Sequence, residues 1–185
     1  MSEVPQARLA ARLRPRRIAD VCGQPHLLAP GRPVAAMLDA GRLVSMLLWG
    51  PPGSGKTTLA SLLADALDLF PVTLRAVDSG VKEIRQALDE ARARLAEGQG
   101  TLVFVDEVHR FHKGQQDVFL PYVEAGDVVF VGATTENPAF ELNPALLSRL
   151  KVFRLAALDE PALGTILDRA FEAAGVPPPG PEARA

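Results

Sequence analysis

The sequence of 185 residues has a single cysteine, Cys22, and no long run of apolar residues. One cysteine excludes an intrachain disulfide and a cysteine-rich zinc site, and it fits a reducing compartment. A membrane-spanning helix needs about 20 consecutive apolar residues, so no membrane span is expected. The arginines near the N-terminus are not followed by the apolar stretch of a signal peptide. We therefore expect a cytoplasmic protein.

Neither sign of charge dominates the chain. Lysine and arginine number 20 and aspartate and glutamate 22, so the formal net charge is −2. This balance argues against a nucleic-acid-binding surface over the whole molecule and leaves room for a local basic patch. Hydrophobic residues make up 48% and charged residues 23%, proportions that argue against a wholly disordered or fibrous chain. The length fits one domain, or one domain and part of a second.

Five short apolar runs alternate with segments of helical periodicity. They predict strands at residues 44–49, 71–77, 101–105, 127–133 and 152–155, and helices at 56–67, 79–97, 115–124 and 144–148. Pro121 is expected to bend or shorten the third of these helices. Further helices are expected at 33–42 and 160–174, before a proline-rich tail. The alternation predicts an α/β fold whose parallel five-stranded sheet is covered by helices on both faces.

A glycine-rich loop joins the first expected strand to the helix after it. Residues 50–57 read GPPGSGKT and match the pattern G-x-x-x-x-G-K-[ST] in the strand–loop–helix context that this motif requires. Backbone N–H groups would hold phosphate oxygens, Lys56 would reach the β- and γ-phosphates, and Thr57 would place its hydroxyl on Mg²⁺. The residues expected to bind ATP or ADP are Gly50, Pro51, Pro52, Gly53, Ser54, Gly55, Lys56, Thr57 and Thr58.

An acidic pair, Asp106 and Glu107, ends the third expected strand. Ligand sites in open α/β sheets lie outside the carboxyl ends of strands, so this pair should converge with the glycine-rich loop. Asp106 would hold the magnesium shell, and Glu107 would polarise or deprotonate the attacking water. The pair favours hydrolysis over simple storage of a nucleotide.

Four longer segments carry a resemblance to a known family. They are SGVKEIR at residues 79–85, FVDEVHRF at 104–111, GATTENP at 132–138 and ALLSR at 145–149. With the two motifs above, they resemble P-loop AAA+ ATPases, and among these the replication-associated recombination protein A (RarA/MgsA) family, over about residues 8–175. The resemblance implies an ATPase acting on single-stranded or forked DNA at the nucleoid, in replication-fork maintenance and recombination.

The resemblance also implies roles for individual residues. Thr135 would end the fourth strand and act as the sensor 1 residue, with Thr134 as the less favoured occupant of that position. Arg149 would be an arginine finger that acts in trans, on the nucleotide of a neighbouring subunit. The segment over the adenine would consist of Arg14 and Pro15 with residues 21–24 (VCGQ), and Arg14, Val21 and Cys22 would bind the nucleotide. With Lys56 and Glu107, Thr135 and Arg149 complete the expected catalytic set.

Basic residues and histidines surround these motifs. A DNA-facing surface and an ordinary solvated face both remain open for the basic residues Lys82, Arg85, Arg110 and Lys113. His109 and His112 lack a third metal ligand at suitable spacing, so polar contacts with nucleotide or DNA are expected of them instead.

The resemblance divides the chain into three parts: an N-terminal segment with the adenine-side loop at 1–32, an AAA+ core at 33–157, and the start of a truncated helical lid with a proline-rich tail at 158–185. The family continues with a full lid and an assembly domain, so we expect a homo-oligomer of the full-length protein, a monomer of this chain, and a single-stranded-DNA-binding protein as a partner. Two alternatives stay open, a nucleotide-binding module without turnover and a clamp-loader-like accessory that acts through protein contacts.

Overall fold

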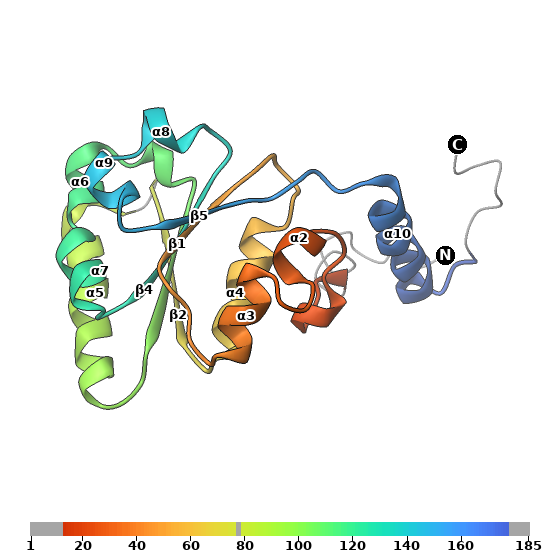
Figure 1. Cartoon of the computed structure of the whole chain (residues 1–185), viewed down its shortest axis with the longest axis horizontal. Helices are drawn as coiled ribbons and strands as arrows, with labels where there is room; N and C mark the ends of the chain where they lie inside the picture. The colour runs from red at the N-terminus through yellow and green to blue at the C-terminus, as the bar shows by residue number, and fades with distance from the viewer. Residues whose placement is uncertain (1–12, 77–78, 178–185) are drawn as a thin grey trace.

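A five-stranded parallel sheet forms the centre of the computed structural model, which describes residues 13–76 and 79–177 (Figure 1). Its strands are β1 (Met46–Trp49), β2 (Phe70–Arg75), β3 (Thr101–Asp106), β4 (Val129–Thr134) and β5 (Lys151–Arg154), in the order β2-β3-β4-β1-β5. The predicted fold class is confirmed. Predictions for residues 1–12 and for the tail after residue 177 lie outside the described residues.

Helices precede, link and follow the strands. They are η1 (Ile18–Asp20), α2 (Pro25–Leu28), α3 (Pro33–Asp39), α4 (Lys56–Ala66), α5 (Val81–Ala96), η2 (Val108–Arg110), α6 (Lys113–Asp117), α7 (Leu120–Ala125), α8 (Pro138–Glu141), α9 (Pro144–Leu147) and α10 (Glu160–Ala174). The single helix expected at 115–124 is wrong, because α6 and α7 divide it. Pro121 lies in the first turn of α7, where its missing N–H removes no intrahelical hydrogen bond.

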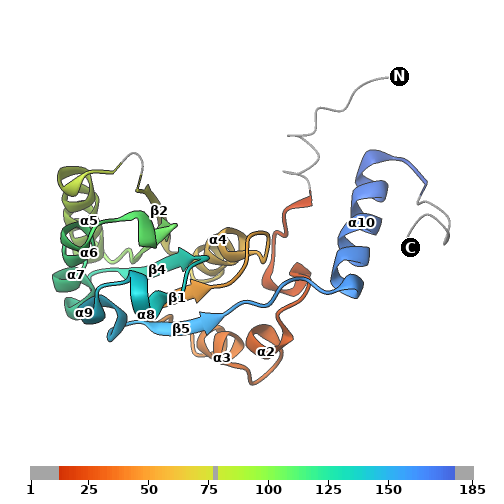
Figure 2. The ribbon, with the colours of Figure 1, turned by 90° about the horizontal axis from the view of Figure 1, so that it is seen from above.

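Helices cover both faces of the sheet (Figures 1 and 2). On one face α5 and α7 pack over a core that includes Leu47, Val103 and Val105. On the other face α3 and α4 pack over a core that includes Met46 and Leu48. Neighbouring residues of β1 thus enter different cores, because successive side chains of a strand point to opposite faces. This explains why the strands of a doubly covered sheet are continuous apolar runs.

The parallel strands bring their carboxyl ends to one edge of the sheet. In the paired strands, Trp49 lies beside Thr134, and Arg75 lies beside Asp106. Residues 13–24 run between α4 and α10, which stands away from the sheet (Figure 2). No helix in the described part of the chain is long and apolar enough to cross a membrane.

Candidate functional site

The glycine-rich loop lies between β1 and α4. Gly53 and Gly55 have φ values of 76° and 94°, a region that residues with a side chain rarely adopt. Lys56 opens α4 and is only 7% exposed. Its Nζ donates hydrogen bonds to the carbonyl oxygens of Gly50 at 2.8 Å and Pro51 at 2.9 Å. The loop therefore curls around its own lysine ammonium.

Ser54 is the one buried side chain, among the described residues, whose polar atom has no hydrogen-bond partner. It is 3% exposed, and buried polar groups are nearly always hydrogen-bonded in folded proteins. Its hydroxyl lies in a loop that ends at the N-terminus of α4, where backbone N–H groups favour an anionic ligand. These features fit a bound nucleotide.

The acidic pair meets the glycine-rich loop. Asp106 ends β3, and its Oδ1 accepts a hydrogen bond from the Glu107 backbone N–H at 3.1 Å. Burial lowers the pKa of Lys56 below its usual value, while the carboxylates of Glu107 and Asp106 act in the opposite direction and less strongly. In the parallel sheet β3, β4 and β1 follow one another, so their carboxyl ends place the acidic pair and the loop before Lys56 at the same edge.

The donor set beside the loop fits Mg²⁺. Thr57 is exposed at the start of α4, and Asp106 is half-buried. Hydroxyl and carboxylate oxygens are hard ligands, and Mg²⁺ is usually held by one or two carboxylates together with substrate phosphates. The described residues contain no group of three His, Cys, Asp or Glu side chains that could hold a metal alone. Thr57 and Asp106 thus suit a metal that arrives with phosphate.

The end of β4 differs from the expectation by one residue. The strand ends at Thr134, not at Thr135, because Thr134 pairs with Trp49 and its carbonyl accepts the N–H of Gly50 at 3.1 Å. Thr134 is fully buried, and its hydroxyl bonds to His109 and to the backbone N–H of Glu136. Thr135 is half-buried, and its hydroxyl has no hydrogen bond to any described residue. Of the two threonines, Thr135 is therefore the one whose hydroxyl remains available to a ligand.

An apolar cavity opens beside the glycine-rich loop. Val21 and Cys22 line it, together with Ser54, Gly55 and Thr58. Pro15 of the same expected segment also lines the cavity, whereas four further lining residues were not foreseen from the sequence: Leu13, Leu158, Ile166 and Arg169. The last two lie on α10 at helical spacing with the buried Ala162, a periodicity that could have indicated the face that α10 turns to the cavity.

Arg14, which the resemblance also places in the adenine-side segment, does not line this cavity. It lines a second cavity with Thr57 and Arg75, on the β2 side of α4. Leu13 and Pro15 both line the first cavity, so Arg14 between them is directed to the other side.

Gln24 ends the segment expected over the adenine, and its side chain joins the segments around the first cavity. It is 3% exposed. Its Nε2 donates to Ala156 O at 2.8 Å and to Ser54 O at 3.3 Å, and its Oε1 accepts from Ala156 N at 2.9 Å. One side chain therefore connects the N-terminal segment, the glycine-rich loop and the link from β5 to α10.

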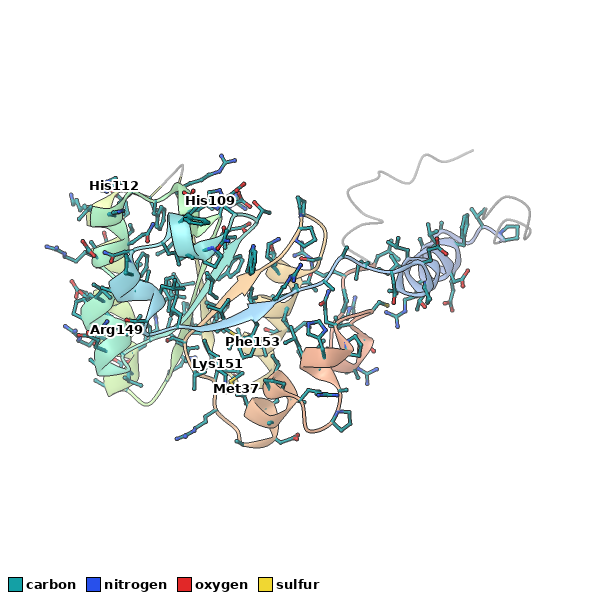
Figure 3. All side chains as sticks on the ribbon, turned by 45° about the horizontal axis from the view of Figure 1, so that its top comes forward. Met37, His109, His112, Arg149, Lys151 and Phe153 are labelled. Carbon is teal, nitrogen blue, oxygen red and sulfur yellow. The ribbon has the colours of Figure 1, made fainter. Side chains whose placement is uncertain are left out.

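Arg149 lies apart from this site, just after α9. Its guanidinium pairs with Glu124 on α7, and Nη1 donates to Ala145 O at 2.7 Å and to Ser148 Oγ at 3.1 Å. Figure 3 shows Arg149 beside the α5–α7 helices. It is exposed, and its contacts within the described chain are with α7 and α9 rather than with the glycine-rich loop. These contacts do not support an action of Arg149 on the nucleotide of its own chain.

The remaining residues singled out in the sequence lie on the outer surface. His112 caps α6, where its Nδ1 accepts the Gln115 N–H at 3.2 Å. The basic residues Lys82, Arg85, Arg110 and Lys113 are all exposed. Arg110 Nε lies 3.6 Å from Glu107 Oε2. Among the described residues, no group of three possible metal ligands includes His109 or His112.

Gly50 is closely packed against Leu155, the residue that follows β5. A Cβ added at Gly50 would lie 2.4 Å from the backbone oxygen of Leu155. The backbone around Leu155 would have to move to make room for this atom. Gly50→Ala should therefore lower the free energy of unfolding by about 1–3 kcal/mol, the usual cost of overpacking. Gly164→Ala is the matched control, since an added Cβ there meets nothing within 4 Å and alanine is favoured inside a helix. Urea unfolding without nucleotide measures both, and equal midpoints for Gly50→Ala and the parent would contradict the expectation.

The site can be compared with known proteins. The family described as "ATPase family associated with various cellular activities (AAA)" matches residues 46–157. Replication-associated recombination protein A of Escherichia coli K12 is 53% identical over 164 residues, which are 89% of this chain and 37% of that protein. ATPase WRNIP1 of Dictyostelium discoideum is 46% identical over 166 residues, 90% of this chain and 19% of that protein. The resemblance predicted from the motifs is confirmed.

A solved structure shares the fold. The Thermotoga maritima RuvB Holliday junction branch migration motor matches with a TM-score of 0.68 and 27% identity, over 89% of this chain and 56% of that chain. The present chain thus spans little more than a third of the curated bacterial relative and just over half of the solved motor.

Proposed function

Because this chain belongs to the ATPase family associated with various cellular activities (AAA), we propose that it is the ATP-binding and ATP-hydrolysing module of a DNA-dependent ATPase in replication-fork maintenance and recombination. The observation that carries the proposal is the buried Lys56 in a complete phosphate loop, at the same edge of the sheet as Asp106 and Glu107. The name of the Escherichia coli relative supports the setting in replication and recombination, and the AAA match supports ATP hydrolysis.

Each residue of the loop and the acidic pair has a role in this proposal. Lys56 would exchange its bonds to Gly50 O and Pro51 O for the β- and γ-phosphates. Thr57 and Asp106 would hold Mg²⁺, which supplies charge neutralisation on the phosphates when bound. Glu107 would orient and deprotonate the attacking water. The base would enter the apolar cavity beside Val21, Cys22 and the P-loop residues that line it.

Two residues would complete the catalytic set. Thr135 would contact the γ-phosphate or the water, since the Thr134 hydroxyl is already engaged by His109 and Glu136. Arg149 would act across a subunit boundary, since its contacts in this chain lie on α7 and α9. The division at residues 1–32, 33–157 and 158–185 is part of the same proposal, with Leu158, Ile166 and Arg169 as the lid's contribution to the cavity.

The partners proposed are single-stranded or forked DNA, further copies of the chain in the full-length protein, and a single-stranded-DNA-binding protein at the nucleoid. Turnover of ATP with and without these DNA structures separates the alternatives. DNA-stimulated turnover supports the proposal, turnover indifferent to DNA supports a clamp-loader-like accessory, and binding without turnover in the full-length protein supports a nucleotide-binding module.

Replacing Lys56 with alanine should weaken binding of a fluorescent ATP analogue with Mg²⁺ to this chain. A hydrogen bond to a charged group contributes about 1.5–3 kcal/mol, so the Kd should rise about 10- to 100-fold. Lys82→Ala removes the same charge from an exposed position on α5 and is the control expected to keep the parent's Kd. Equal affinity of Lys56→Ala and Lys82→Ala would show that nucleotide binds elsewhere.

A further inference from the structure

A chain of side-chain contacts joins Glu107 to the end of β4. His109 Nε2 lies 3.3 Å from Glu107 Oε2, and His109 Nδ1 lies 2.9 Å from Thr134 Oγ1. His109 is on η2 after β3, while Thr134 ends β4, 25 residues further along the chain. The His109 side chain is 14% exposed, and Thr134 is fully buried. Figure 3 shows where His109 lies at this edge of the sheet.

The hydrogen-bond distances indicate which atoms carry the protons in the contacts between Thr134, His109 and Glu107. Thr134 Oγ1 accepts the backbone N–H of Glu136 at 3.0 Å. Its own proton is then best donated to His109 Nδ1 at 2.9 Å, since the alternative acceptor, Glu136 O, lies at 3.4 Å. The imidazole proton is then on Nε2, which faces the acceptor-only carboxylate of Glu107. Every donor meets an acceptor in the direction from Thr134 through His109 to Glu107.

Glu107 has a conformation that needs support. Its φ of 52° is unusual for a residue with a side chain. Both His109 and Arg110 approach the same carboxylate oxygen, Oε2. The other oxygen, Oε1, has no hydrogen bond or ion pair within the described ranges. One side of the carboxylate is thus held by nitrogen atoms while the other side stays available to water.

Thr134 also contacts the phosphate loop. Its carbonyl accepts the N–H of Gly50, the first residue of the loop, at 3.1 Å. Its side chain therefore reaches the acidic pair while its backbone is bonded to the loop. Thr135, the proposed sensor, is the next residue. A contact between Thr135 and the nucleotide would therefore act on the same end of β4 that Thr134 connects to Glu107.

We propose that His109 and Thr134 are positioning residues. They orient the Glu107 carboxylate and fix its position relative to the phosphate loop and to Thr135. The inference rests on the proposed ATP hydrolysis, in which Glu107 is the catalytic residue. A displacement of about 1 Å at a reacting group can lower a rate about 10²-fold. Removing the imidazole should therefore reduce turnover without removing any contact to the nucleotide.

The kinetic test uses the full-length oligomeric protein. His109→Phe keeps a planar ring and loses both nitrogen atoms, so we expect kcat to fall about 10²-fold with the Kd for ATP within twofold of the parent. His109→Gln keeps an N–H donor at the reach of Nε2 and should recover part of kcat. Thr134→Val should lower kcat and Thr134→Ser should not. In a Glu107→Gln background, His109→Phe should cause no further loss.

The outcomes separate this inference from the function on which it rests. A parent that neither binds nor hydrolyses ATP contradicts the proposed function. A parent that hydrolyses ATP in a Glu107-dependent way, with His109→Phe and Thr134→Val both within twofold of it, overturns this inference alone. A parallel fall in ATP affinity or melting temperature would assign the two residues a structural role and would also overturn it.

Nitrogen-15 NMR of the imidazole tests the same geometry on this chain without turnover. The signals of His109 are assigned by their loss in His109→Phe. We expect a proton on Nε2, which the contact with Glu107 requires, and a shift of the Nδ1 signal in Thr134→Val. A neutral ring protonated only on Nδ1 would leave Nε2 facing the carboxylate without a proton and would overturn the inference.

Discussion

Mixing two inactive variants of the full-length protein, Arg149→Ala and Lys56→Ala, should restore part of the ATPase activity that each lacks alone. An arginine finger stabilises charge on the transferring phosphoryl group and contributes about 10³-fold or more to turnover. Arg149 is exposed, and its partners are Glu124 and the turn of α9. If it acts in trans, some interfaces of a mixed oligomer pair an intact phosphate loop with an intact finger.

A second mixture provides the control. Lys56→Ala and Glu107→Gln both damage the nucleotide-binding side of an interface, so no arrangement of these two subunits creates a complete site. Mixed assembly is demonstrated by co-purification of differently tagged variants before activity is measured. Absence of recovery in the Arg149→Ala and Lys56→Ala mixture, once mixed assembly is shown, would count against the trans role.

Glu107→Gln should abolish most turnover in the full-length protein while leaving nucleotide binding unchanged. Glutamine keeps the length of the side chain, and its amide oxygen can still accept from His109, but it cannot take a proton from water. Loss of a general base typically lowers a rate about 10²- to 10⁴-fold. Single-turnover hydrolysis and the Kd for ATP measure the two effects separately.

Glu136→Gln is the matched control for that variant. Glu136 follows the end of β4 and is exposed, and its backbone rather than its carboxylate makes the bonds to Thr134. Turnover should therefore remain at the parent's level. If Glu107→Gln also hydrolyses ATP at the parent's rate, another group orients the attacking water, and the proposed role of Glu107 is wrong.

Contiguous motifs were the most informative part of the sequence. The run from Gly50 to Thr57 specifies a glycine-rich turn between a strand and a helix, and the structure contains β1 and α4 on either side of it. The apolar run before Asp106 likewise becomes β3. Strand ends were less accurate. β4 extends to Thr134 because of its pairing with Trp49, a contact that no local pattern contains.

Contacts between distant segments explain what was missed. Arg14 lies in a cavity with Thr57 and Arg75, not in the one that Val21 and Cys22 line. The hydrogen bonds of Gln24 to Ala156 join residues that are 132 positions apart. The pairing of His109 with Thr134 spans two neighbouring strand ends. None of these partners could be chosen from spacing, because each depends on how strands are ordered and how helices pack.

By itself, the sequence determined the parallel α/β architecture, the phosphate loop and the acidic strand end, because apolar periodicity and short motifs describe geometry within a few residues of chain. Only the tertiary structure decided how these parts meet. Parallel pairing in the order β2-β3-β4-β1-β5 places the ends of β1, β3 and β4 together, and with them Lys56, Glu107 and Thr134. The orientation of Glu107 is therefore set by His109 and Thr134, through contacts that exist only once the strands are paired.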